Sequence, residues 1–122
     1  DGGRAVGAFH AGWRGLAAGM GRAAAAAMGT ADLHAAIGPH IRPCCYAVGA
    51  ELESSFPAER FERRGANLYL DLGAEARAQL KTAGIAAERI FESGLCTSCR
   101  PDLASWRRDR VRRNMLAFVA PA

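Results

Sequence analysis

The chain alternates between short apolar runs and longer segments rich in alanine, a pattern typical of strands connected by helices. The apolar run at residues 5–9 ends abruptly at the glycine-bounded segment 10–15, which predicts a buried strand followed by a turn. Residues 16–28 are dominated by alanine, with larger apolar residues at multiples of four, and predict a helix. A second short strand over 34–39 would complete a βαβ unit with parallel strands.

The central part of the chain predicts further elements. Residues 44–56 have an approximate apolar face and are expected to form a helix limited by Pro57. The charged residues 61–66 are expected to be a connector, and residues 68–70 a brief extended piece.

The last third of the chain contains one well-marked helix. Asp71 is a candidate N-cap for a helix through Ala83, with Gly84 as its stop. Strands are expected over 89–91 and over 115–119, the latter closing a sheet edge. These elements predict an α/β or α+β fold, a mixed sheet with flanking helices, in one domain over residues 1–122 without an internal boundary.

The composition adds two constraints. Of the 122 residues 27 are alanine and only 7% are aromatic, so the core must consist of small side chains in close contact. No stretch reaches the roughly 20 apolar residues that a membrane helix needs, which excludes a spanning helix. The first residues resemble no secretory leader, so a cytoplasmic protein is expected.

The positive charge is concentrated near the end of the chain. The net charge is +4, and residues 100–113 hold six arginines against two aspartates, which accounts for the whole excess. Arginine suits planar, bidentate recognition of phosphate or carboxylate. A solvated face or a patch that binds nucleic acid are the alternatives, and nucleic acid is the less favoured one.

Four cysteines occur in two pairs, Cys44 with Cys45 and Cys96 with Cys99. The adjacent pair is expected to reach one metal poorly because its side chains diverge, so the pattern is a weak zinc signal. Disulfides are not expected, because nothing in the sequence indicates an exported protein. The cysteines are therefore expected to be buried, reduced thiols.

His10 is the first candidate for chemistry. It follows a predicted strand and precedes a glycine-rich turn, at the strand end where open α/β sheets bind ligands. Histidine there serves as a metal ligand or a general base, or else as a core residue bonded to backbone. His40 could reach the same edge, whereas His34 is expected at the surface. A zinc site needs three or four ligands, and no complete set is evident.

Two aromatic–arginine segments accompany these histidines. Trp13 and Arg14 would suit a base and a phosphate, or would cap the core and bond carbonyls. In residues 105–109 (SWRRD), the adjacent Arg107 and Arg108 are expected to point to opposite sides. One would then face a pocket while its neighbour pairs with Asp109 or meets solvent.

Three motifs in order together resemble one family. They are HAGWRG at 10–15, IGPxIxPCCYxVG at 37–49, and CTxC at 96–99 followed by SxRRD at 105–109. They closely resemble the laccase-domain family, whose members were first named multicopper polyphenol oxidases. Members are now described as zinc-dependent purine nucleoside phosphorylases with adenosine deaminase activity. The resemblance implies a layered α/β/β/α-type enzyme fold, with purine nucleosides and phosphate as substrates.

The resemblance also implies which residues act. Family members bind one zinc through a His-Cys-His set, and the last of these ligands corresponds to His10. The other two precede it in the family, so the chain is expected to be the C-terminal part of such an enzyme. None of the four cysteines matches the family's ligand. Arg14 and Arg107 are the candidates for substrate binding, and the missing half is a candidate partner.

The sequence departs from the family at several positions. Trp106 replaces the usual tyrosine, and Asn114 stands where an arginine is expected, next to Arg113 in place of a glycine. His40 and Arg42 replace small residues. The alternatives to the phosphorylase are a copper-dependent phenol oxidase, ranked lower because one His-Cys-His set lacks a multicopper relay, and a non-catalytic basic or truncated chain.

Overall fold

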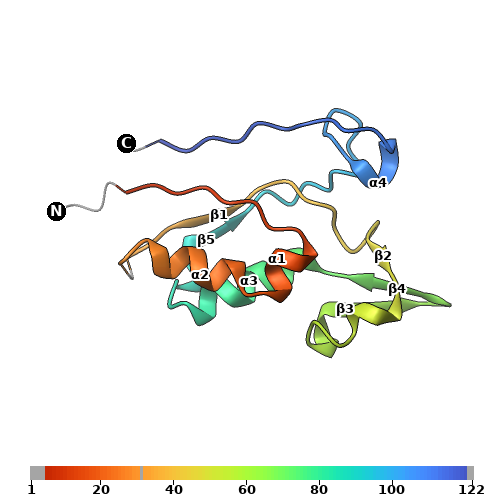
Figure 1. The fold of residues 1–122 in the computed structure, drawn as a ribbon, viewed down its shortest axis with the longest axis horizontal. Coiled ribbons are helices and arrows are strands. Elements are labelled where there is room, and N and C mark those ends of the chain that lie inside the picture. Colours follow the sequence, from red (N-terminus) through yellow and green to blue (C-terminus); the bar gives the residue numbers. More distant parts are fainter. Residues whose placement is uncertain (1–4, 31, 121–122) are drawn as a thin grey trace.

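The computed structural model describes residues 5–30 and 32–120 (Figure 1). Its helices are α1 (Trp13–Ala17), α2 (Met20–Ala27), α3 (Leu72–Thr82) and α4 (Trp106–Asp109). Its strands are β1 (Ala35–Ile37), β2 (Ala47–Val48), β3 (Phe61–Arg64), β4 (Asn67–Leu70) and β5 (Ile90–Glu92). Short 3₁₀ turns are η1 (Ala50–Leu52), η2 (Ala58–Arg60) and η3 (Ala87–Arg89).

The strands form two small sheets of different type. β1 and β5 pair in parallel, with Ala36 opposite Phe91, and an isolated bridge between His40 and Cys96 extends this pairing. β2, β4 and β3 form an antiparallel sheet in that order. The expected α/β class with mixed strand directions is confirmed. The partner of β1 was predicted wrongly, because it is β5 rather than the strand expected at 5–9.

Helix α3 is the element that the sequence predicted best. The Asp71 side chain accepts a hydrogen bond of 2.8 Å from the Ala74 N–H, which is an N-cap. Beyond the helix, Gly84 adopts a φ of 94°. α3 packs against β1, β5 and α2, and therefore connects the helical layer to the parallel pair.

The helix predicted over 16–28 is divided into α1 and α2. Gly19 between them has a φ of 80°, which ends one helix and starts the other. The Gly21 N–H donates to Gln79 Oε1 at 3.0 Å, and the Gln79 amide donates to the Leu16 carbonyl at 2.6 Å. A Cβ at Gly21 would lie 3.0 Å from the Gln79 Cβ, so glycine favours this close approach of α2 to α3.

Two apolar clusters form the core. The larger one lies between α1, α3 and the antiparallel sheet and consists of Leu16, Tyr46, Leu52, Phe56, Leu70 and Leu72. The smaller one joins α2, α3 and β5 through Ala25, Leu80, Ile85 and Ile90. Alanine-rich α2 contributes few large side chains. The prediction that the core consists of small side chains was nevertheless wrong, because most of the buried apolar residues are leucine, isoleucine or aromatic.

Two central predictions were wrong. Residues 44–56 do not form a helix, because Cys44 and Cys45 lie in a turn that leads into β2 and then η1. The charged segment 61–66 is not a connector, since it contains β3 and the tip of its hairpin with β4. Pairing with the apolar β4 overrides the high polarity of β3.

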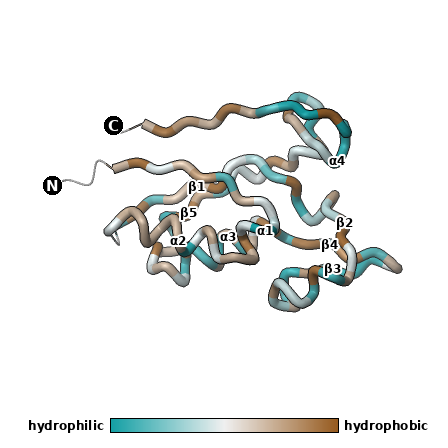
Figure 2. The backbone as a smooth tube through the Cα atoms, viewed as in Figure 1, coloured by the Kyte–Doolittle hydropathy of each residue, from teal (hydrophilic) through white to brown (hydrophobic). Residues whose placement is uncertain are grey.

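The two terminal segments, residues 5–12 and 110–120, run as extended chain outside both sheets (Figure 1). The strands predicted at 5–9 and 115–119 are wrong, because neither segment pairs with a strand among the described residues. Leu116 is 92% exposed and Phe118 88% exposed, and the hydrophobic colouring of the last segment is evident in Figure 2. No described helix is long and apolar enough to cross a membrane.

Candidate functional site

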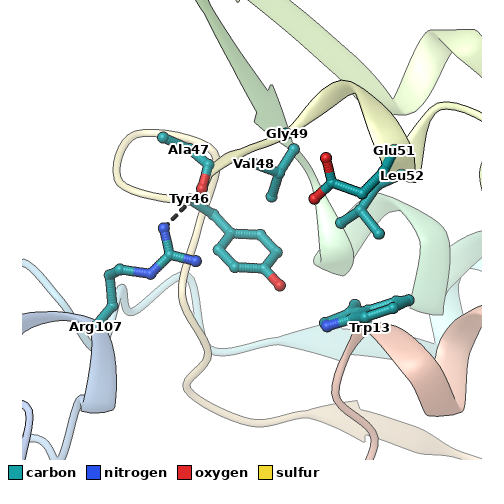
Figure 3. A pocket seen from close by; sticks show the side chains of 8 residues that line it. All are labelled: Trp13, Tyr46, Ala47, Val48, Gly49, Glu51, Leu52 and Arg107. Atoms are coloured by element: carbon teal, nitrogen blue, oxygen red, sulfur yellow. Dashed lines mark hydrogen bonds between the residues drawn. The ribbon is translucent and has the colours of Figure 1, made fainter.

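A pocket of about 330 Å³ lies where α1, β2, η1 and α4 meet (Figure 3). Trp13 forms one wall and Tyr46 the centre, while Arg107 reaches in from α4. The Arg107 guanidinium donates to the Ala47 carbonyl at 2.6 Å and lies 5.1 Å from the centre of the Tyr46 ring. We call this site the arginine pocket. Its size is at the lower end for small-molecule sites.

Two arginines act electrostatically on Tyr46. Burial raises the pKa of the Tyr46 hydroxyl, and the positive charges of Arg107 and Arg14 oppose that rise. The Arg14 guanidinium lies 4.4 Å from the centre of the Trp13 ring. Both predicted substrate-binding residues therefore lie near one aromatic pocket, although only Arg107 lines it, together with the carboxylate of Glu51. Tyr46 was not among the predicted site residues, although it belongs to the second motif.

His10 lines a second hollow and not the arginine pocket. This hollow of about 600 Å³ has its other walls in residues 104–115, and His10 is exposed. Trp106, Arg112, Arg113 and Asn114 surround this hollow. Hence three of the residues that depart from the family pattern, Trp106, Arg113 and Asn114, lie around the predicted metal ligand. Among the described residues, His10 belongs to no group of three potential ligands.

Arg108 holds a neighbouring turn of the chain and does not line the arginine pocket. Its guanidinium donates to the carbonyls of Thr97, Ser98, Arg100 and Leu103 and forms an ion pair with Asp109, with 2.6 Å between Nε and Oδ1. The hydrogen bonds from Arg108 hold the pKa of Asp109 below its usual value. One of the adjacent arginines thus faces a pocket while the other pairs with Asp109, as predicted. The extended chain on which that prediction rested was wrong, because both arginines lie in the helix α4.

The arginine-rich segment is therefore partly used inside the protein. Arg100 pairs with Asp102 at 2.8 Å, and Arg113 lies 3.8 Å from Asp109. Together with the carbonyl contacts of Arg108, these pairs reduce the charge that is free to bind a polyanion.

His34 and His40 contribute less to a site. His34 is exposed and stacks on Phe91 with ring centroids 6.3 Å apart. His40 does not line the hollow at His10. Its Nε2 lies 3.8 Å from Glu92 Oε1, against Gly73 of α3, where a Cβ would lie only 2.7 Å away. Gly73 thus provides the room that this histidine needs.

The structure brings all four cysteines together. The Sγ atoms of Cys44, Cys45, Cys96 and Cys99 all lie within 4.8 Å of one another. We call this group the thiol cluster, and it could bind a metal ion. The expectation that the thiols are buried was wrong, because only Cys96 is buried, while Cys45 is partly exposed and Cys44 and Cys99 are exposed. The argument that adjacent cysteines diverge assumed regular backbone, whereas Cys44 and Cys45 lie in a turn.

Hydrogen bonding makes the four thiols unequal. Burial alone would raise the pKa of Cys96, but N–H groups, first that of Arg42, favour its thiolate and lower the pKa to about 6. Hydrogen bonds with the neighbouring cysteines, first Cys45, raise the pKa of Cys99 to about 12. Cys96 is therefore the first thiol of the cluster to ionise.

Comparisons with known proteins found a family model and several similar proteins. The family model described as multi-copper polyphenol oxidoreductase laccase matches residues 1–121. A protein of Aquifex aeolicus named purine nucleoside phosphorylase is 40% identical over 117 residues, covering 93% of this chain and 55% of that protein. The purine nucleoside phosphorylase YlmD of Geobacillus stearothermophilus is 38% identical over 130 residues, covering 93% and 47%.

A solved structure extends the likeness to three dimensions. The crystal structure of the Bacillus licheniformis hypothetical protein YfiH has a TM-score of 0.75 and 34% identity, covering 83% of this chain and 43% of that one. This chain spans about half the length of the curated relatives that it matches. The resemblance drawn from the three motifs is confirmed, and the chain belongs to the multi-copper polyphenol oxidoreductase laccase family.

Proposed function

We propose that this chain is part of an enzyme that cleaves purine nucleosides with phosphate, releasing the base and a sugar phosphate. The observation that carries the proposal is the 40% identity to a protein named purine nucleoside phosphorylase over 93% of this chain. The proposal includes adenosine and inosine as substrates and the cytoplasm as location, a compartment that keeps thiols reduced.

The chain would supply the C-terminal part of a single domain. In support, relatives are about twice as long, and both terminal segments expose large apolar side chains. Apolar surface of this kind is buried when a domain is complete. We therefore propose that the remainder of the domain covers the terminal segments, whether it is joined to this chain or separate.

The arginine pocket would bind substrate. Trp13 and Tyr46 offer aromatic faces to a purine, and such stacking contributes about 1–3 kcal/mol per base. Arg107 offers N–H donors in a plane, which suits a phosphate oxygen pair, and Arg14 adds positive potential nearby. In phosphorolysis the sugar becomes cation-like, so a phosphate held beside it is both the nucleophile and a stabilising charge.

His10 would contribute one nitrogen ligand to the metal. The described residues around it, in 104–115, offer neither a thiol nor a second imidazole, so they do not complete a zinc site. The proposal requires the metal's other ligands to come from outside this chain.

The test is phosphorolysis by the full-length protein that contains this chain. With inosine and phosphate we expect hypoxanthine and ribose 1-phosphate, measured by chromatography, and no hypoxanthine without phosphate. Arg107→Ala should lower kcat/KM by about tenfold or more, since a hydrogen bond to a charged group contributes about 1.5–3 kcal/mol. Arg63→Ala, a change at an exposed arginine on β3, is the matched control. Equal rates for both variants would remove Arg107 from the substrate site.

Assays on the same full-length protein distinguish two further activities. Adenosine deaminase activity, which we include in the proposal, would form inosine from adenosine without phosphate. The second candidate is a copper-dependent phenol oxidase, favoured by the name of the matched family. Oxygen uptake with a phenolic substrate after copper loading, without phosphorolysis after zinc loading, would support the oxidase instead.

A further inference from the structure

We propose that Cys44, Cys45, Cys96 and Cys99 bind one zinc ion as a structural tetrathiolate site, separate from the ligand His10. The thiol cluster is built entirely from this chain and needs no residue from the missing part of the domain. Its role would be to join two turns beside the arginine pocket, one that directly precedes Tyr46 and one that Arg108, the neighbour of Arg107, contacts.

The spacing of the sulfur atoms suits a tetrahedral ion. A Zn–S bond of about 2.3 Å places the sulfurs of a regular tetrahedron about 3.8 Å apart. The Sγ atom of Cys99 lies 3.7 Å from that of Cys44 and 3.4 Å from that of Cys45. These separations are far longer than a disulfide bond of about 2.05 Å. Small adjustments of the side chains would give four equal metal–sulfur distances.

The backbone explains why the four thiols converge. The N–H groups of Cys45 and Tyr46 both donate to the Arg42 carbonyl at 2.9 Å, which closes the first turn. The N–H of Arg100 donates to the Cys96 carbonyl at 3.1 Å, which closes the second. The bridge between His40 and Cys96 sets the two turns side by side, because it continues the parallel pairing of β1 and β5.

Groups around the sulfurs support a negatively charged centre. Four thiolates and one Zn²⁺ carry a net charge of −2, and each thiol that binds releases its proton to solvent. The Arg42 N–H points to Cys96 Sγ at 3.5 Å, and the Arg64 guanidinium donates to the Pro43 carbonyl at 3.4 Å beside the first turn. Donors and positive charges of this kind orient thiolate ligands and offset their charge.

Zinc bound at the thiol cluster would also hold the residues of the arginine pocket in place. Tyr46 directly follows Cys45, and Arg107 precedes Arg108, whose guanidinium holds the carbonyls of the second turn. An ion between the turns therefore fixes Tyr46 relative to Arg107. Arg108 acts as a positioning residue, because it contacts the turn and not the sulfurs.

The test is zinc content in the full-length protein with His10→Ala, which removes the other proposed ligand. We expect one zinc per chain by elemental analysis, with four sulfur neighbours at about 2.3 Å in X-ray absorption. Adding Cys99→Ser, a change at an exposed residue, should abolish this zinc. Adding Ser98→Ala in the same turn is the matched control and should retain it. Because the measurement is zinc content and not activity, its result is independent of whether the protein catalyses phosphorolysis.

A second variant tests the positioning role. Arg108→Ala should weaken zinc binding by about 10–100-fold, the range measured for residues that support metal ligands. The proposal is overturned if the His10→Ala protein contains no zinc and all four thiols of the cluster react with an alkylating reagent. It is also overturned if the zinc is bound through nitrogen and oxygen atoms. A mass lower by two hydrogens, showing a disulfide within the cluster, would equally overturn it.

Discussion

The body of the molecule, residues 13–109, and its terminal segments differ in how their apolar residues are used. In the body Leu70 is 0% exposed, while in the last segment Leu116 is 92% exposed. The thiol cluster in the body has all its members, whereas His10 in the first terminal segment has no companion ligands among the described residues. The difference supports the proposal that the terminal segments are covered by the remainder of the domain, whereas the body buries a core of its own.

The largest expected effect compares Leu70 with Leu116. Leu70→Ala should lower the free energy of unfolding by about 2–5 kcal/mol, because it leaves a cavity in the main cluster. Leu116→Ala in the same chain should change it by less than about 0.5 kcal/mol, as is typical of exposed positions. Urea unfolding measures both. Equal losses of unfolding free energy in the two variants would mean that Leu116 is buried in solution. The contrast between the body and the terminal segments would then not hold.

The next effect concerns the contact between α2 and α3. Gln79→Ala should cost about 1–3 kcal/mol, because the Gly21 N–H and the Leu16 carbonyl lose their buried partner. Asn114→Ala in the terminal segment is the control and should have almost no effect on this chain. Thermal unfolding followed by circular dichroism distinguishes the two. A neutral Gln79→Ala would show that α2 is loosely attached.

A smaller effect compares two helix caps. Asp71→Ala should cost about 1 kcal/mol, while Asp71→Asn should retain most of the stability. Ser105→Ala, at the cap of the four-residue α4, should cost less than about 0.5 kcal/mol, since its hydrogen bond is 3.4 Å long against 2.8 Å at Asp71. Urea unfolding of the three variants gives the ranking, and a reversed order would contradict it.

The smallest effect is a pH dependence at the pocket. Since burial raises the pKa of Tyr46 in the folded protein, the unfolded chain ionises first as pH rises. This contribution to stability is therefore present below pH 10 and is lost at more alkaline pH. A spectroscopic titration of phenolate should show a delayed component that Tyr46→Phe removes. An unchanged titration in Tyr46→Phe would place the delayed group elsewhere.

Local signals in the sequence predicted part of the fold well. The N-cap of α3 at Asp71, its stop at Gly84 and the strand at 68–70 depend on a few neighbouring residues, which is why they were predictable. Residues 44–56 were predicted as a helix because their apolar spacing is approximately helical. Pairing of β2 with β4 decided otherwise, and that partner is about 20 residues away.

The candidate sites, like the fold, were predicted from the sequence only in part. The sequence by itself determined the family, the arginine-rich segment and the candidates His10, Arg14 and Arg107, because motifs are local patterns of residue types. Only the tertiary structure brought Cys44 and Cys45 to Cys96 and Cys99 and placed Arg107 on Tyr46. Such contacts join residues more than 50 positions apart through the parallel pairing of β1 with β5. The physical reason is that strand pairing and turn closure act across the chain, whereas residue spacing describes only near neighbours.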